Sequence, residues 1–210
     1  MIENELNSAN DNPIIDGDNE RVLHGGHFYG GHIAMAMDTL KTAVANLADL
    51  LDRQMAQLMD YKFNNGLPFN LTGAEGERKP INHGFKAVQI GISAWTAEAL
   101  KHTMPASVFS RSTECHNQDK VSMGTIASRD CLRVLQLTEQ VAAASLLAAT
   151  QALELRKKHN ELDDNHFSPA LKAMTTAVLS DFEPVIEDRP LEGDLRKFIT
   201  MIQQQHWSLY

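Results

Sequence analysis

The chain has 210 residues, of which 43% are hydrophobic, 22% are charged and 6% are aromatic. Its 27 acidic and 19 basic residues give a net charge of −8, so the chain lacks the positive field that attracts nucleic-acid backbones. No run approaches the roughly 18 apolar residues that a membrane-spanning helix needs, so we expect neither a nucleic-acid partner nor a membrane.

The N-terminal segment, MIENELNSANDNP, has neither a cationic start nor an apolar core, so we expect no signal peptide. The only cysteines are Cys115 and Cys131, which are too few for a disulfide framework. Two reduced thiols are typical of a cytoplasmic protein, and the sequence therefore predicts that location.

Helical periodicity begins at residue 33. Apolar residues then recur at spacings of three and four, which predicts one long helix of about seven turns with a single apolar stripe. The stripe consists of Ile33, Met37, Leu40, Val44, Leu47, Leu51, Met55 and Leu58. Glycine and proline cluster between residues 64 and 80 and predict the end of this helix.

Two further long helices are expected. One spans about residues 82–102 and is stopped by Pro105, and the other spans about residues 121–155. The second contains EQVAAASLLAATQALELR, whose many alanines favour a helix and allow neighbouring helices to approach closely. Long helices of this kind gain their stability from packing, so a bundle is expected, and the isolated chain should dissolve poorly.

Shorter helices are expected at about residues 170–179 and 191–204. No alternating pattern of useful length predicts a β-strand. The predicted fold class is therefore all-α, a long-helix bundle, with residues 1–210 forming a single helical domain. Within it, residues 1–31 form motif loops, 32–160 the long bundle helices and 161–210 the short C-terminal helices.

The stretch LHGGHFYGGHIA, residues 23–34, places His24, His27 and His32 among four glycines just before the first long helix. A metal site is possible for imidazoles but no thiolate or carboxylate lies close by in sequence, so we expect no metal. The stretch also lacks the GxxxxGK[ST] pattern of a phosphate-binding loop. A turn whose glycines take positive φ, with surface histidines, is the simplest interpretation.

A second polar cluster, STECHNQDKVSMG, spans residues 112–124 and precedes the third long helix. Its amides and carboxylates could cap that helix, or they could hold the polar groups of a small ligand. A third cluster, NSANDNP at residues 7–13, has the composition of a turn.

Taken in this order, the three clusters resemble motifs of the aromatic amino acid ammonia-lyase family, which includes histidine, phenylalanine and tyrosine ammonia-lyases and the related aminomutases. NSANDNP resembles the family's NSxNDNP, GGHFYGG its GGNF segment, and HNQDKVSMG its HNQDxxS(M/L)G. The resemblance covers nearly the whole chain but only the C-terminal part of a family member. It implies the corresponding part of the helical ammonia-lyase fold.

The resemblance also implies chemistry: ammonia is eliminated from an aromatic α-amino acid to give an arylacrylate. The family's electrophile is a methylidene-imidazolone group made from an Ala-Ser-Gly tripeptide, which this chain lacks. The family segment that supplies a catalytic Tyr and a carboxylate-binding Arg is also missing. Family members are usually homotetramers whose active sites combine several subunits.

Site residues follow from the same resemblance. Phe28 matches the family's active-site Phe, and Asn117 and Gln118 match amides that form hydrogen bonds within the site. Glu114 matches a Glu near the substrate amine in phenylalanine ammonia-lyases, and His27 stands where the family has Asn. Gln118 stands where histidine ammonia-lyases carry Glu, which favours tyrosine or phenylalanine as the substrate.

These observations support one main hypothesis. In this hypothesis the chain is one component of a two-chain aromatic amino acid ammonia-lyase and is inactive alone. A second ammonia-lyase-like chain supplies the methylidene-imidazolone group in a hetero-oligomer, such as a heterotetramer. Three alternatives stay open: the aminomutase version of the same chemistry, a catalytically inactive structural or regulatory subunit, and a metal-binding helical protein.

Overall fold

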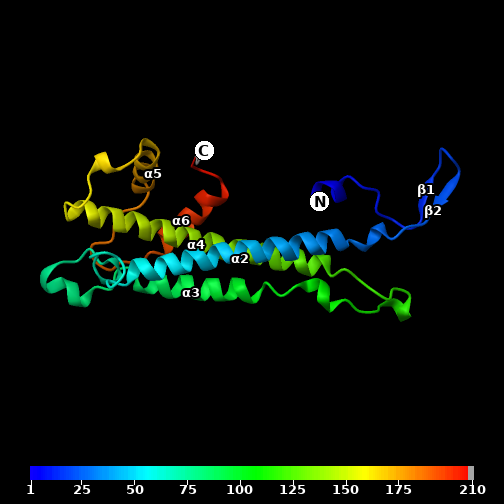
Figure 1. Ribbon diagram of the computed structural model, residues 1–210, viewed down its shortest axis with the longest axis horizontal. Helices are drawn as coiled ribbons and strands as arrows, with labels where there is room; N and C mark the ends of the chain where they lie inside the picture. Colours follow the sequence, from blue (N-terminus) through cyan, green and yellow to red (C-terminus); the bar gives the residue numbers. More distant parts are fainter. Residues whose placement is uncertain (208–210) are drawn as a thin grey trace. The chain divides into compact units, whose positions relative to one another are not determined.

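A computed structural model describes residues 1–207, and it is mainly helical (Figure 1). The strands among these residues, β1 (Ile14–Asp16) and β2 (Arg21–Leu23), form one antiparallel pair with Ile15 opposite Val22. The α-helices are α1 (Ile2–Leu6), α2 (Gly31–Met59), α3 (Lys86–Lys101), α4 (Gly124–Lys158), α5 (Pro169–Leu179) and α6 (Glu192–Gln203). The predicted all-α, long-helix class is confirmed.

The five helices expected from periodicity are present, and their ends lie close to the predicted ones. Helix α1 and the β1–β2 hairpin were not expected, because five helical residues and three-residue strands are too short to show a periodic pattern. Short 3-10 turns punctuate the connections, including His27–Tyr29, Ala106–Phe109 and Glu114–His116. No described helix has the length and apolarity required to span a bilayer.

Helix α3 begins four residues later than predicted because its N-terminal approach is fixed from far along the chain. The Asp188 carboxylate accepts hydrogen bonds from the backbone N–H groups of His83, at 2.9 Å, and Gly84, at 2.8 Å. Burial alone would raise the pKa of Asp188, but these bonds outweigh it and lower the pKa. Gly84 has φ +53°, and a Cβ there would lie 2.5 Å from the carbonyl oxygen of Asn70, so only glycine fits.

The described chain divides into two compact units. Unit 1 comprises residues 1–45 and 99–135, and unit 2 comprises residues 46–98 and the chain from Gln136 onward. Unit 1 contains all five of the predicted site residues. The single domain expected for residues 1–210 stays a prediction beside this division.

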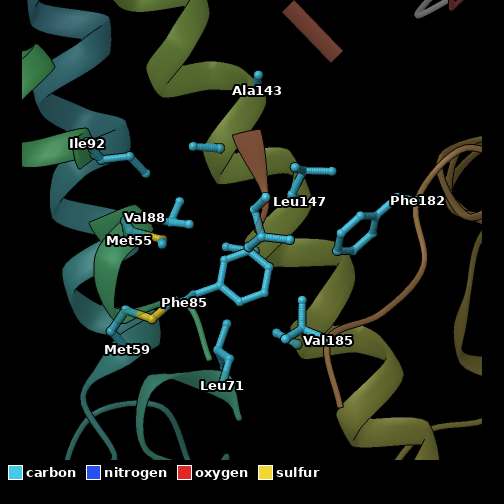
Figure 2. Packing of buried hydrophobic residues seen from close by; sticks show 14 of the residues in the cluster. Met55, Met59, Leu71, Phe85, Val88, Ile92, Ala143, Leu147, Phe182 and Val185 are labelled. Atoms are coloured by element: carbon cyan, nitrogen blue, oxygen red, sulfur yellow. The ribbon is translucent and has the colours of Figure 1, made fainter. Parts of the chain in front are cut away.

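Unit 2 holds the main hydrophobic core, in which α2, α3 and α4 contribute residues to one cluster (Figure 2). Aromatic rings at Phe85, Phe182 and Phe198 meet edge to face with centroids about 6.5 Å apart. Gln151 lies within this core and is fully bonded: its amide nitrogen donates to the carbonyl oxygens of Leu71 and Val185. Its oxygen accepts from the backbone N–H of Val185, so no polar group of this amide is left unpaired.

The buried face of α2 differs from the predicted apolar stripe. Leu40 and Leu47 of that stripe are exposed, the second by 58%. The buried residues also recur at spacings of four and three, and all but Met55 lie one position after a residue of the predicted stripe: Ala34, Asp38, Lys41, Ala45, Ala48, Asp52, Met55 and Met59. Alanines on this face allow the close approach of neighbouring helices, while Leu40 and Leu47 are left on the surface and Leu51 and Leu58 pack at the edge of the core.

Candidate functional site

The first two sequence motifs lie against each other. The backbone N–H of Gly25, in the glycine-rich loop, donates a 3.0 Å hydrogen bond to the side-chain oxygen of Asn12 in NSANDNP. The chain then forms a 3-10 turn over His27–Tyr29 and passes through Gly30, whose φ is +68°. This left-handed conformation ends the 3-10 turn directly before α2, and a glycine with positive φ is what the pattern predicts in this loop.

The third motif leads into α4 at a point close to the start of α2. The Ser122 hydroxyl accepts a 3.3 Å hydrogen bond from the backbone N–H of Gly124, which is the first residue of α4. A Cβ on Gly124 would lie 3.5 Å from the carbonyl oxygen of Gly30 and 3.8 Å from the backbone nitrogen of Ala34. These are ordinary van der Waals distances, and they show that the two helix starts lie side by side.

A hollow of about 380 Å³ opens at this junction. It is lined by two aromatic side chains from the glycine-rich loop, Phe28 and Tyr29, by Gln118, and by residues 120–126. Phe28 is 47% exposed, so its ring is available to a ligand. The structure thus brings together Phe28 and Gln118, which the sequence analysis selected from two separate motifs.

The other polar residues of the third motif form a compact turn. The backbone N–H of Thr113 donates to the carbonyl oxygen of Gln118 at 2.9 Å, and the amide nitrogen of Asn117 donates to a Glu114 carboxylate oxygen at 3.4 Å. The three residues from Glu114 to His116 all have positive φ, between 53° and 69°. Neither Glu114 nor Asn117 lines the 380 Å³ hollow. Within this chain, the two residues are connected to Gln118 through the turn and do not share the hollow with it.

His27 lines a different hollow, of about 450 Å³, together with Tyr29, His32 and residues of α1 and the NSANDNP loop. The His32 Nδ1 atom lies 3.8 Å from a carboxylate oxygen of Glu5. In the described part of the chain, no group of three or more His, Cys, Asp or Glu side chains is arranged to hold a metal ion.

The structure adds Tyr29 and Lys120 to the residues around the 380 Å³ hollow. Sequence reasoning missed them because neither stands at a motif position that the family resemblance singles out. Lys120 brings a positive charge, Gln118 a neutral donor and acceptor, and the two rings an apolar surface. This combination suits a small molecule that has an aromatic body and a carboxylate.

Comparison with known proteins identifies the class that this fold and these motifs define. A sequence model of the family described as aromatic amino acid lyase matches residues 1–180. The chain therefore belongs to the aromatic amino acid lyase family.

Individual relatives agree with that assignment. The chain is 41% identical over 203 residues to a tyrosine ammonia-lyase from Cereibacter sphaeroides, covering 96% of this chain and 37% of that protein. The crystal structure of a tyrosine aminomutase from Streptomyces globisporus matches with a TM-score of 0.84 and 32% identity, covering 96% of this chain and 36% of that one. A histidine ammonia-lyase structure from Trypanosoma cruzi matches with a TM-score of 0.86 and 28% identity, covering 97% and 38%.

The chain thus spans little more than a third of the length of these relatives. Their names include ammonia-lyases and aminomutases, and their substrates include tyrosine and histidine. Membership of the family follows directly from the comparisons. The reaction, the substrate and the partners of this chain are matters for proposal.

Proposed function

We propose that this chain is one subunit of a two-chain aromatic amino acid ammonia-lyase, which eliminates ammonia from tyrosine or phenylalanine to give an arylacrylate. The observation that carries the proposal is the shared hollow, where Phe28 from one family motif and Gln118 from another line the same space. An inactive scaffold would need the helix packing but not an open hollow lined by these two motif residues.

The family's methylidene-imidazolone group cannot form from this chain, because the sequence has no Ala-Ser-Gly tripeptide. What the chain offers is a wall beside such a group: an exposed ring at Phe28 and a neutral amide at Gln118. The group would supply an electrophile for the substrate amine when bound. Phe28 would pack against the aromatic part of the site, and Gln118 and Lys120 would orient polar groups of the substrate.

Glu114 and Asn117 complete the proposed catalytic wall, with Glu114 near the substrate amine. Their mutual contact of 3.4 Å holds them at one side of the turn that ends at Gln118. His27, on the neighbouring hollow, would lie at the edge of the pocket in place of the family's Asn. Gln118 is uncharged, which favours tyrosine or phenylalanine, whose side chains are neutral at pH 7, over a substrate with a cationic side chain.

We propose that the remaining site residues come from a second ammonia-lyase-like chain in a hetero-oligomer, such as a heterotetramer. Exposed apolar side chains on α2 and α4, such as Leu47, Leu50 and Leu132, are suited to helix packing against it. Both cysteines are free thiols, which supports a cytoplasmic location for the complex.

Intact mass spectrometry on the complex, purified from its source without denaturant, tests this proposal. We expect a second polypeptide that contains Ala-Ser-Gly and is lighter than its sequence by two water molecules. The same preparation should convert tyrosine or phenylalanine to the corresponding arylacrylate. An assembly that contains this chain alone, without activity on either amino acid, would contradict the two-chain enzyme.

In the assembled complex we expect Gln118→Ala to lower kcat/KM by about 10- to 100-fold, because a hydrogen bond to a charged substrate group is lost. The measurement is steady-state formation of the arylacrylate, with assembly checked by native mass spectrometry. Gln204→Ala, at an exposed position just after α6 and away from the faces of α2 and α4 assigned to the partner, is the matched control and should leave the rate unchanged. Unchanged turnover in Gln118→Ala would favour the inactive structural or regulatory subunit.

The aminomutase reaction is the second candidate, because the chain matches the Streptomyces globisporus tyrosine aminomutase structure over 96% of its length. The two reactions share their first part and differ in whether ammonia returns to the β-carbon. Chromatography of the products separates them: a lyase yields the arylacrylate, and an aminomutase yields a β-amino acid from the same substrate.

A further inference from the structure

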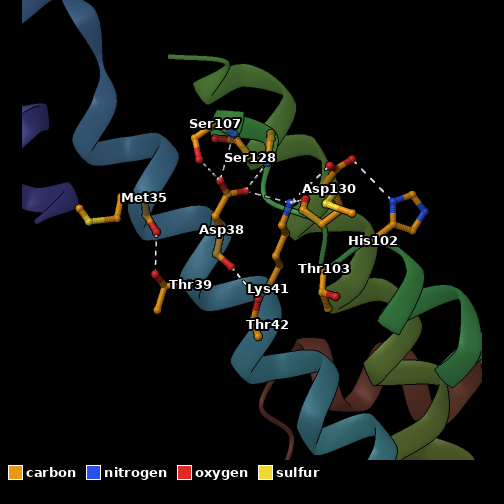
Figure 3. Close-up of polar contacts among 12 residues, drawn as sticks. Met35, Asp38, Thr39, Lys41, Thr42, His102, Thr103, Ser107, Ser128 and Asp130 are labelled. Atoms are coloured by element: carbon orange, nitrogen blue, oxygen red, sulfur yellow. Dashed lines mark hydrogen bonds and ion pairs between the residues drawn. The ribbon is translucent and has the colours of Figure 1, made fainter. Parts of the chain in front are cut away.

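Unit 1 contains a buried cluster of charges around Lys41 (Figure 3). The Lys41 side chain is fully buried, and its Nζ atom donates a 2.7 Å hydrogen bond to the carbonyl oxygen of Met104. The same atom lies 2.9 Å from an oxygen of Asp38 and 3.5 Å from an oxygen of Asp130. Burying an ammonium group is unfavourable unless it is fully paired, so the loss of any one of these contacts would destabilise the folded chain.

The Asp38 carboxylate fixes the start of the 3-10 helix Ala106–Phe109. It accepts hydrogen bonds from the backbone N–H groups of Ala106, at 3.0 Å, and Ser107, at 3.3 Å, and from the Ser107 hydroxyl at 3.0 Å. These residues begin the 3-10 helix Ala106–Phe109. Burial by itself would raise the pKa of Asp38, but the hydrogen bonds from Lys41, Ala106 and Ser107 together lower it.

The segment that starts at this anchor carries the candidate catalytic residues. The Ser110 hydroxyl accepts a 3.0 Å hydrogen bond from the backbone N–H of Val121, which closes the segment on itself. Inside that closure, the backbone N–H of Thr113 donates to the carbonyl oxygen of Gln118. The position of Gln118 therefore depends on where residues 106–110 are held.

Lys41 also reaches the helix that follows this segment. Asp130 belongs to α4, and its second carboxylate oxygen lies 3.7 Å from the Nδ1 atom of His102, just after α3. Through Met104 and Asp130, the ammonium group of Lys41 contacts the chain both before and after residues 106–123. One cation on α2 thus pairs with groups on both sides of the segment.

We propose that Asp38 and Lys41 are positioning residues for the site: they hold the two ends of the 106–123 segment against α2, so that Gln118 keeps its place on the wall beside Phe28. The catalytic consequence rests on the proposed ammonia-lyase function, whereas the effect on the segment itself does not. Neither residue lines the 380 Å³ hollow, so both act through the segment rather than by contact with the substrate.

Amide hydrogen exchange, followed by mass spectrometry on the full chain in its complex, tests the structural half. Asp38→Asn should speed exchange in peptides covering 103–121 by more than tenfold, because charge-assisted hydrogen bonds to two backbone N–H groups are weakened. Ser107→Ala removes only one hydroxyl donor, so exchange there should rise about two- to tenfold. This milder variant keeps the test decisive if Asp38→Asn folds poorly.

Two controls show that an increase is local. Peptides covering 141–155 of α4, in the core of unit 2, should exchange at the same rate in all variants. Asp49→Asn, a substitution of the same chemistry on α2 outside the Lys41 cluster, should leave residues 103–121 unchanged. Unaltered exchange of 103–121 in both Asp38→Asn and Ser107→Ala would overturn the proposal, whether or not the complex has ammonia-lyase activity.

A double-mutant cycle tests the catalytic half. If Asp38 acts through Gln118, then Asp38→Asn should lower kcat/KM at least tenfold in wild-type background and by less than twofold in a Gln118→Ala background. A purely structural role of Asp38 would give multiplicative effects, because loss of folded complex is independent of Gln118. Multiplicative losses would overturn the positioning role, and absence of any turnover in the unmodified complex would instead refute the proposed function.

Discussion

We expect Ile92→Ala to lower the free energy of unfolding of the chain by about 2–5 kcal/mol, because its side chain is fully buried in the core of unit 2. The substitution removes three carbon atoms from a site where α2, α3 and α4 meet, and the neighbours can refill the space only in part (Figure 2). Urea unfolding followed by circular dichroism at 222 nm measures the change.

The same helix supplies a matched control. Ile90→Ala makes the same chemical change on α3, but Ile90 is 63% exposed. Its effect on the isolated chain should stay within about 0.5 kcal/mol. Equal losses of unfolding free energy in the two variants would contradict the assigned burial of α3, because a buried and an exposed isoleucine should differ in this quantity.

Much of the fold could be predicted from the sequence because helix periodicity is a local signal. Helix α2 ends just before the break between residues 64 and 80, and α3 ends just before the proline at 105. The alanine-rich run near 141–152 lies within α4. The side of α2 that is buried was harder to predict. Hydropathy assigns Asp38 and Lys41 to solvent, although their mutual pairing lets both be buried.

Contacts between distant residues could not be read from a pattern. Asp188 fixes the approach to α3 by accepting hydrogen bonds from His83 and Gly84, and no local rule links these positions. Gln151 similarly satisfies backbone groups of Leu71 and Val185 inside the core. Asp188 takes the place of the local cap that helix rules describe, and Gln151 pairs backbone groups that no local rule would connect to it.

The candidate site was predictable only in part, because motifs reveal single residues but not the contacts between them. Phe28 and Gln118 were selected only because each belongs to a motif that resembles the family, and the structure places both on one hollow. Glu114 and Asn117 are neighbours of Gln118 in sequence but lie outside that hollow, in a turn whose residues 114–116 all have positive φ. Their proposed catalytic role depends on residues supplied from outside this chain.

Lys41→Met should be the most destabilising of the polar substitutions in unit 1. Methionine keeps an unbranched chain as far as Cε but removes the ammonium group, which leaves Asp38 and Asp130 without the cation that they share. Breaking a buried ion pair from one side lowers the free energy of unfolding by about 3–5 kcal/mol. Lys86→Met, at an exposed position of α3, is the control and should change stability by about 0.5 kcal/mol or less.

The pH dependence of this loss identifies its cause. In the wild type the pKa of Asp38 is lowered, so its stabilising contribution is complete above its ordinary value of 3.8 and is lost as the pH falls through the lowered folded value. In Lys41→Met, a buried carboxylate has lost its cationic partner, and protonation removes its unpaired negative charge. The stability difference between the two proteins should therefore narrow as the pH falls from 7 toward 4, and Asp38→Asn combined with Lys41→Met should recover part of the loss at pH 7. A difference that is constant with pH would mean that lost packing, rather than the unpaired carboxylates, causes the destabilisation.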